Sequence, residues 1–197
     1  MKHIYLSHAL DTKAHNKLFT TGNFNAPNNV LIPMQKALTP DVEIFISINN
    51  FYERDAFMLE NTLIETIRQS EADGFIVDQI FTRDFHDVDT ILLESLSNEI
   101  KDKHFIIGPS FTRVPYFLHS RLAEIFIDHD VSGIMYDLRG IDINDFQELQ
   151  AIAKLKMHVK KRIDIIPLVH ESQIEELKKS IPFDVYVVDP IEPSKRL

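Results

Sequence analysis

Seven short apolar runs recur along the chain, and each is rich in isoleucine, valine, phenylalanine or tyrosine. Runs of this length and composition are typical of strands that are buried on both faces, as in a parallel sheet. Polar residues follow each run directly, which indicates where each strand leaves the core. The runs cover residues 3–10, 42–48, 74–80, 104–110, 133–138, 163–169 and 183–189.

Amphipathic segments separate most of these runs, and their apolar residues recur at helical spacing. They cover residues 55–71, 87–102, 143–159 and 171–181. Asp87 and Asn144 are the expected N-caps of the second and third segments. Strands that alternate with helices predict parallel pairing through right-handed crossovers. Two α/β architectures satisfy this order, a closed (βα) barrel and an open doubly wound sheet.

The N-terminal region departs from this alternation. Loop-forming residues at 21–29 stand where a long helix would otherwise connect the first two apolar runs. A turn at residues 11–13 predicts that residues 3–10 and 16–21 pair as an antiparallel hairpin, and a short helix is expected at 30–38. No linker or change in composition divides the chain, so residues 1–197 are expected to form a single domain.

Composition and charge exclude several classes of function. The 197 residues carry a formal net charge of −9, which argues against a DNA- or RNA-binding surface. The chain has no cysteine, and therefore neither disulfides nor thiolate metal sites. No signal peptide and no apolar run long enough to span a membrane is evident, so a cytoplasmic protein without membrane contact is expected. The oligomeric state does not follow from the sequence.

Candidate functional residues gather where the expected strands end. Ligands of both architectures bind at the carboxyl ends of parallel strands, because the loops there surround one mouth. The alternative is that these residues have no function, since any strand must end in something polar to leave the core. The candidate ligand-binding residues are Asn49, Asp78, Arg113, Asp137, Arg139, His170, Glu171 and Asp189.

The motifs of cofactor and nucleophile chemistry are missing from the sequence. Paired histidines at metal-binding spacing are absent, so no metal site is predicted. The five glycines form neither a dinucleotide-binding turn nor a phosphate loop. No serine lies in a nucleophile elbow. No cofactor and no specific catalytic residue is therefore expected.

Five stretches, in chain order, carry a resemblance to a known family. They are IYLSHALDTKAHNKLFTTGN, IFISINNFYERDAFMLENTLIETIRQ, GFIVDQIFTRDFHDVDTILLESLSNEIKDKHFIIGPSF, GIMYDLRG and IIPLVHESQIEELKKSIPFDVYVVDP. Their order resembles the EAL-type cyclic di-GMP phosphodiesterase domain over nearly the whole chain. The resemblance implies a modified TIM-like (βα) barrel that opens on an antiparallel strand. The alternatives are a regular parallel barrel and an open doubly wound sheet.

The resemblance places four residues at functional positions of that family, namely Asn49, Asp78, Asp137 and Glu171. Other defining positions are changed. Residues 17–20 lack the glutamate of the Glu-Ala-Leu motif, Gly108-Pro109 replace paired aspartates, and Met135 replaces the catalytic lysine. Leu168 and Val188 also replace polar residues of the family. The resemblance therefore implies a degenerate active site that does not hydrolyse cyclic di-GMP.

Two functional hypotheses follow, together with a third in which the domain only provides structure. The first is a regulatory module that binds a protein partner or, with less support, a nucleotide. The second is a small (βα)-barrel enzyme whose acid–base groups act on a small polar or phosphorylated substrate. Its acid–base groups would be Asp78 and Asp137 with either His170 or Glu171. We expect Asp78 and Asp137 at one rim, Glu171 facing the cavity and His170 turned away.

Overall fold

The computed structural model describes residues 2–7, 17–21, 43–48, 56–142 and 146–189 of the chain. Eight strands fall in these ranges. They are β1 Lys2–Ser7, β2 Lys17–Thr21, β3 Glu43–Ile48, β4 Gly74–Val77, β5 His104–Ile107, β6 Gly133–Asp137, β7 Asp164–His170 and β8 Val185–Asp189. The seven expected strands are all present, and the second strand expected near residues 16–21 is β2.

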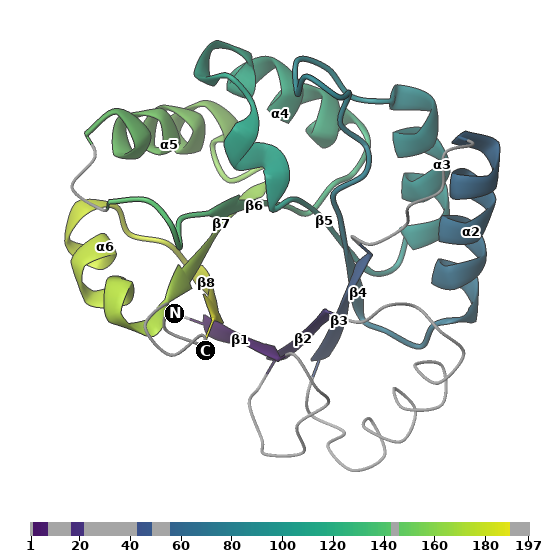
Figure 1. Cartoon of the computed structure of the whole chain (residues 1–197), viewed down its shortest axis with the longest axis horizontal. Helices are drawn as coiled ribbons and strands as arrows, with labels where there is room; N and C mark the ends of the chain where they lie inside the picture. The colour runs from purple at the N-terminus through teal and green to yellow at the C-terminus, as the bar shows by residue number, and fades with distance from the viewer. Residues whose placement is uncertain (1, 8–16, 22–42, 49–55, 143–145, 190–197) are drawn as a thin grey trace.

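The strands close into a barrel in the order β1 to β8, with β8 pairing back onto β1 (Figure 1). Every pair of named strands is parallel, including β1 with β2, where Tyr5 lies opposite Leu18. The predicted antiparallel hairpin is therefore wrong, and so is a barrel that opens on an antiparallel strand. A turn in the sequence shows that the chain changes direction, but it does not fix the direction in which the next strand pairs. The closed ring also excludes the open doubly wound sheet, so the regular parallel barrel is the architecture observed.

The described helices lie on the outside of the barrel (Figure 1). The α-helices described are α2 Ala56–Gln69, α3 Thr90–Ile100, α4 His119–Asp128, α5 Phe146–Val159 and α6 Ile174–Ser180. Three short 3₁₀ turns accompany them, η1 Ser110–Arg113, η2 Tyr116–Leu118 and η3 Glu171–Gln173. The four helical segments predicted around 55–181 are confirmed, whereas α4 was not among them. The expected helix at 30–38 lies outside the described residues. Among the described residues no helix is long and apolar enough to cross a membrane.

The N-cap of α3 is Asp89 and not Asp87 as predicted. The Asp89 carboxylate accepts hydrogen bonds from the backbone N–H groups of Ile91 and Leu92, at 3.1 and 3.0 Å. Asp87 lies in the preceding loop, where its carboxylate accepts hydrogen bonds from Val88 and Arg121. A carboxylate two residues too early cannot reach the first free N–H groups of the helix. The other expected cap, Asn144, lies outside the described residues.

The core has two layers that follow from the alternation of side chains along each strand. A larger cluster fills the space between the barrel and its helices. A smaller cluster fills the inside of the barrel and consists of Phe45, Ile76, Ile106, Met135, Ile166, Leu168 and Val187. The side chains described on β3 to β8 therefore pack the inside of the barrel with apolar groups. The next inward positions along β4, β6, β7 and β8 are polar, and they form its carboxyl-terminal mouth.

Candidate functional site

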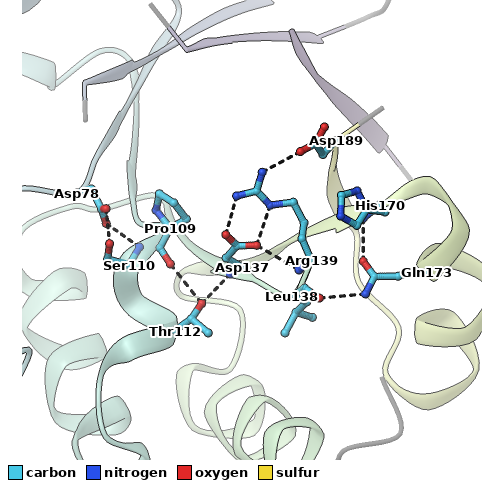
Figure 2. A network of polar contacts seen from close by, with 10 residues as sticks. All are labelled: Asp78, Pro109, Ser110, Thr112, Asp137, Leu138, Arg139, His170, Gln173 and Asp189. Carbon is cyan, nitrogen blue, oxygen red and sulfur yellow. Dashed lines mark hydrogen bonds and ion pairs between the residues drawn. The ribbon is translucent and has the colours of Figure 1, made fainter. Parts of the chain in front are cut away.

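The alternation of inward and outward side chains decides which strand ends face the mouth. Asp137 lies two residues beyond Met135, and Met135 points into the barrel interior. The same step leads from Leu168 to His170 on β7 and from Val187 to Asp189 on β8. Side chains two residues apart share one face of a strand. These three polar residues therefore form the layer directly above the apolar interior (Figure 2).

The centre of this layer is the guanidinium group of Arg139, which follows β6 (Figure 2). Its Nε and Nη2 atoms donate to the two oxygens of Asp137 at 2.9 and 2.7 Å, in a bidentate pair. Its Nη1 atom donates to Asp189 Oδ2 at 2.8 Å, and Asp189 is fully buried. The hydrogen bonds to Asp137, and after them the one to Asp189, raise the pKa of Arg139 above its usual value. Arg139 is thus a fixed cation that links the ends of β6 and β8.

Asp78 occupies the same rim, one residue beyond β4. Its Oδ1 atom accepts a hydrogen bond from the Ser110 backbone N–H at 2.7 Å, and its Oδ2 atom accepts one from the Ser110 hydroxyl. Burial raises the pKa of the Asp78 carboxyl, and the two hydrogen bonds oppose this rise only in part. As expected from the sequence, Asp78 and Asp137 lie at one rim of the barrel. Each of them, however, is already engaged within the protein.

The turn η1 connects Asp78 with Asp137, because its Ser110 bonds to the Asp78 carboxylate and its Thr112 bonds to the Asp137 backbone. The Thr112 hydroxyl donates to the Pro109 carbonyl oxygen at 3.2 Å and accepts from the Asp137 backbone N–H at 2.7 Å. Gly108 permits this path, because its φ of +127° and its contact with the Met135 carbonyl leave no room for a Cβ atom. The loop after β5 is therefore held tightly against the end of β6.

His170 ends β7 and is 4% exposed. The side-chain oxygen of Gln173 accepts a hydrogen bond from the His170 backbone N–H at 2.8 Å. The His170 Nδ1 atom forms no hydrogen bond of normal geometry with the described residues. The backbone of Gln173 lies near the ring, as in a capping box. The imidazole is therefore held in place by its backbone and its packing, while its ring nitrogens are not committed to a strong internal hydrogen bond.

Gln173 also links His170 to the loop that carries Arg139. Its Nε2 group donates to the Leu138 carbonyl at 3.0 Å (Figure 2). The same group lies 3.4 Å from the Ile141 carbonyl. The residues before and after Arg139 are thus tied to the turn after β7. Gln173 was not among the predicted site residues. The spacing of a capping box, in which the third residue after the cap is Gln or Glu, is the signal in the sequence that identifies it.

A cavity of about 540 Å³ opens at this mouth. Its lining combines the charged and hydroxyl groups above with one further arginine, Arg113 of η1. The lining residues are Pro109, Ser110, Thr112, Arg113, Asp137, Arg139, Gly140, Ile141 and His170. Asp78 and Asp189 support this lining from behind. A concave site with a few convergent polar groups is the ordinary form of a small-molecule site.

Four of the eight predicted residues line the cavity, namely Arg113, Asp137, Arg139 and His170. Glu171 is exposed and does not line it. The expectation that Glu171 faces the cavity and His170 turns away is therefore wrong. The inward positions of β7 are the even-numbered residues from Ile166 onward, and the strand continues through His170. Asn49 lies outside the described residues.

The described residues include no group of three or more histidine, aspartate or glutamate side chains placed to hold one metal ion. The carboxylates of the mouth illustrate why. Both oxygens of Asp137 accept hydrogen bonds from Arg139, and both oxygens of Asp78 accept hydrogen bonds from Ser110. These oxygens would have to exchange their present partners before they could coordinate a cation.

No protein family and no curated protein matches the sequence. Solved structures do resemble the fold. CutC of Streptococcus agalactiae, described as a candidate copper homeostasis protein, superposes with a TM-score of 0.75 at 12% identity, over 95% of this chain and 97% of that one. An aldolase named QR15 gives a TM-score of 0.65 at 11% identity, over 95% and 89%. The 2,3-dimethylmalate lyase of the PEP mutase/isocitrate lyase superfamily gives 0.61 at 12%, over 98% and 76%. At these identities the similarity shows a TIM-barrel-like fold, and it lends no support to the EAL resemblance.

Proposed function

We propose that this protein is a small (βα)-barrel enzyme that carries out acid–base chemistry on a small polar substrate in the cavity at the carboxyl ends of β5, β6 and β7. One observation carries the proposal: the buried imidazole of His170 and the fixed guanidinium of Arg139 line the same cavity. In parallel barrels this end of the strands is where catalytic groups lie. The lyase and the aldolase among the similar structures fit such a role but do not specify a reaction.

His170 is the residue proposed to transfer the proton. Imidazole is the side chain used most often for general acid–base catalysis near neutral pH. Its position on the inner face of β7 brings it to the substrate, and the bond to Gln173 keeps the backbone there in place. A group that reaches the reacting atoms through one ring nitrogen, here Nε2 because Nδ1 is buried, can accept a proton and return it at a later step.

Arg139 is proposed to stabilise negative charge that develops on the substrate. A guanidinium has five N–H donors, and three of those of Arg139 are used by Asp137 and Asp189. One N–H on each of Nη1 and Nη2 remains. The two carboxylates fix the orientation of the group before substrate binds, which is the condition for efficient electrostatic stabilisation. Asp137 and Asp189 therefore position Arg139 and do not transfer protons themselves.

The competing hypothesis is that the protein is a regulatory module that binds a protein partner. This hypothesis came from the EAL resemblance. The parallel pairing of β1 with β2 contradicts the antiparallel opening strand that this resemblance implies. The enzymatic proposal is therefore the better supported of the two.

The proposal is tested by screening purified protein against small hydroxy, oxo and phosphorylated compounds, with loss of substrate followed by NMR. We expect turnover of at least one class, and a decrease of about 10²- to 10⁴-fold in kcat for His170→Gln, which removes the acid–base group. The matched control is His86→Gln, because His86 is exposed and does not line the cavity. Turnover that is equal in His170→Gln and wild type would refute the role of His170, and the absence of any turnover would refute the enzyme.

A further inference from the structure

The charged groups at the mouth leave mainly N–H donors to bind a ligand, although aspartates outnumber arginines there. Each oxygen of Asp78 and Asp137 already accepts at least one hydrogen bond from within the protein. Asp189 accepts one from Arg139 and is fully buried. The carboxylates are therefore engaged by partners within the protein, both that of Asp137 in the lining and those of Asp78 and Asp189 behind it, whereas several N–H groups of the arginines remain unused.

Arg113 is the least engaged of these cations. It is exposed, it lines the cavity, and it forms no ion pair or hydrogen bond with the described residues. Its guanidinium instead lies over the ring of Phe85, 4.3 Å from the ring centroid. A guanidinium that stacks on an aromatic face keeps the N–H groups at its edge available for a planar or tetrahedral anion.

The loop between β4 and α3 holds Phe85 in a fixed place beneath Arg113. Phe85 has a φ of 59°, which is uncommon for a residue with a side chain. Its backbone N–H donates to the Thr82 carbonyl at 2.9 Å, and the Thr82 N–H donates to the Asp87 carbonyl at 2.9 Å. The ring of Phe85 packs against Phe81, with centroids 5.7 Å apart. The loop therefore accepts an unfavourable backbone angle and presents an ordered aromatic platform.

We infer that the substrate of the proposed enzyme carries an oxyanion, a carboxylate or a phosphate, and that Arg113 binds it in the cavity. This inference rests on the proposed function and specifies the class of its substrate. Arg113 binds the oxyanion through N–H groups at the edge of its guanidinium, while Phe85 supports the face of the group. Arg139 lines the same cavity, and Asp137 and Asp189 fix the orientation of its guanidinium. An oxyanion that contacts both arginines meets two positive groups whose positions are set before it binds, which reduces the entropic cost of binding.

The test uses two probes, inorganic phosphate and malonate, each titrated into the full chain by calorimetry at low ionic strength. Arg113→Met retains most of the length of the side chain and removes the guanidinium, while Arg113→Lys retains the charge without the planar fork. The matched control is Arg83→Met. Arg83 is exposed, comes from the loop that carries Phe85 and does not line the cavity, so its loss changes the net charge equally.

We expect wild type and Arg83→Met to bind at least one probe with equal affinity. Arg113→Met should lose about tenfold or more, as when a charge-assisted hydrogen bond is removed, and Arg113→Lys should be intermediate. Preference for phosphate or for malonate identifies which oxyanion the substrate bears. Two results would overturn the inference: neither probe binds to wild type, or Arg113→Met and Arg83→Met bind equally.

These outcomes are separate from those that test the enzyme. Binding of an anion that depends on Arg113, without turnover of any compound, supports the ligand class and refutes the catalytic role. Turnover of a neutral compound that depends on His170 and not on Arg113 supports the enzyme and refutes the oxyanion. The binding and turnover measurements therefore show separately whether the oxyanion inference or the enzyme proposal is wrong.

Discussion

Arg139 and Asp189 are joined by a hydrogen bond of 2.8 Å between Nη1 and Oδ2, although 50 residues separate them along the chain. The bond connects the loop after β6 to the end of β8 and crosses the mouth of the barrel (Figure 2). Asp189 is fully buried, while the side chain of Arg139 is 25% exposed. One partner of the pair is therefore shielded from solvent, and the other forms part of the wall of the cavity.

Replacement of Arg139 by methionine should destabilise the fold, because Asp189 then keeps a buried charge without its cation. We expect a loss of about 3 kcal/mol in the free energy of unfolding, measured with urea. The double variant Arg139→Met/Asp189→Asn should regain about 1 kcal/mol or more of that loss, since the charge is removed along with its partner. Equal stabilities of the single and the double variant would contradict the pairing.

The pH dependence of stability should change in Asp78→Asn. Burial raises the pKa of Asp78 in the folded state above its ordinary value of 3.8. The folded protein therefore binds the proton more tightly, and stability is lost as the pH rises from about 4 through the raised pKa. Asparagine retains the shape and stays neutral. We expect Asp78→Asn to show a smaller decrease than wild type across this range in urea unfolding at several pH values, and an unchanged profile would contradict the assignment.

Two glycines offer a matched comparison of backbone requirements. A Cβ atom at Gly108 would lie 2.5 Å from the Met135 carbonyl oxygen at a φ of +127°, whereas one at Gly140 meets nothing within 4 Å. Gly108→Ala should cost about 2 to 4 kcal/mol, because both strain and overlap with backbone oppose it. Gly140→Ala should change stability by less than about 1 kcal/mol. Similar melting temperatures for the two variants would show that the loop after β5 adopts another path.

Gln173 should position the site and not take part in the reaction. Gln173→Leu removes the acceptor of the His170 N–H and the donor to Leu138 while keeping a similar volume. We expect faster amide exchange at His170 by NMR and a lower kcat on any substrate identified, with the melting temperature little changed. Gln150→Leu serves as the control, since Gln150 is exposed on α5. Unchanged exchange at His170 would show that the contact is not maintained in solution.

The prediction that the protein does not hydrolyse cyclic di-GMP remains untested. Gly108-Pro109 and Met135 stand where the resembling family has two acids and a lysine, and Met135 packs inside the barrel. We expect no turnover of cyclic di-GMP with added magnesium or manganese in a chromatographic assay. Activity above a protein-free control that is lost in Asp137→Ala would contradict this.

Sequence periodicity was sufficient for much of the fold. The apolar runs located the seven expected strands, and the amphipathic segments located α2, α3, α5 and α6. Both signals are local. A strand buried on two faces is apolar throughout, and a helix buried on one face has apolar residues at helical spacing, so each pattern lies within a single element. The alternation of side chains along a strand was also sufficient to predict that His170 points into the barrel. Counting from Ile166 through Leu168 along β7 gives an inward His170, and the resemblance to the EAL family obscured this by drawing attention to Glu171.

The sequence by itself determined that strands and helices alternate and that polar residues follow the strands at one end. The tertiary structure decided three further points: that β1 pairs with β2 in parallel, that Arg139 reaches Asp189, and that Gln173 connects two loops. The reason is physical. Local periodicity reports only how each residue is buried within its own element. The direction of strand pairing and the partner of a long polar side chain depend on which elements become neighbours when the barrel closes.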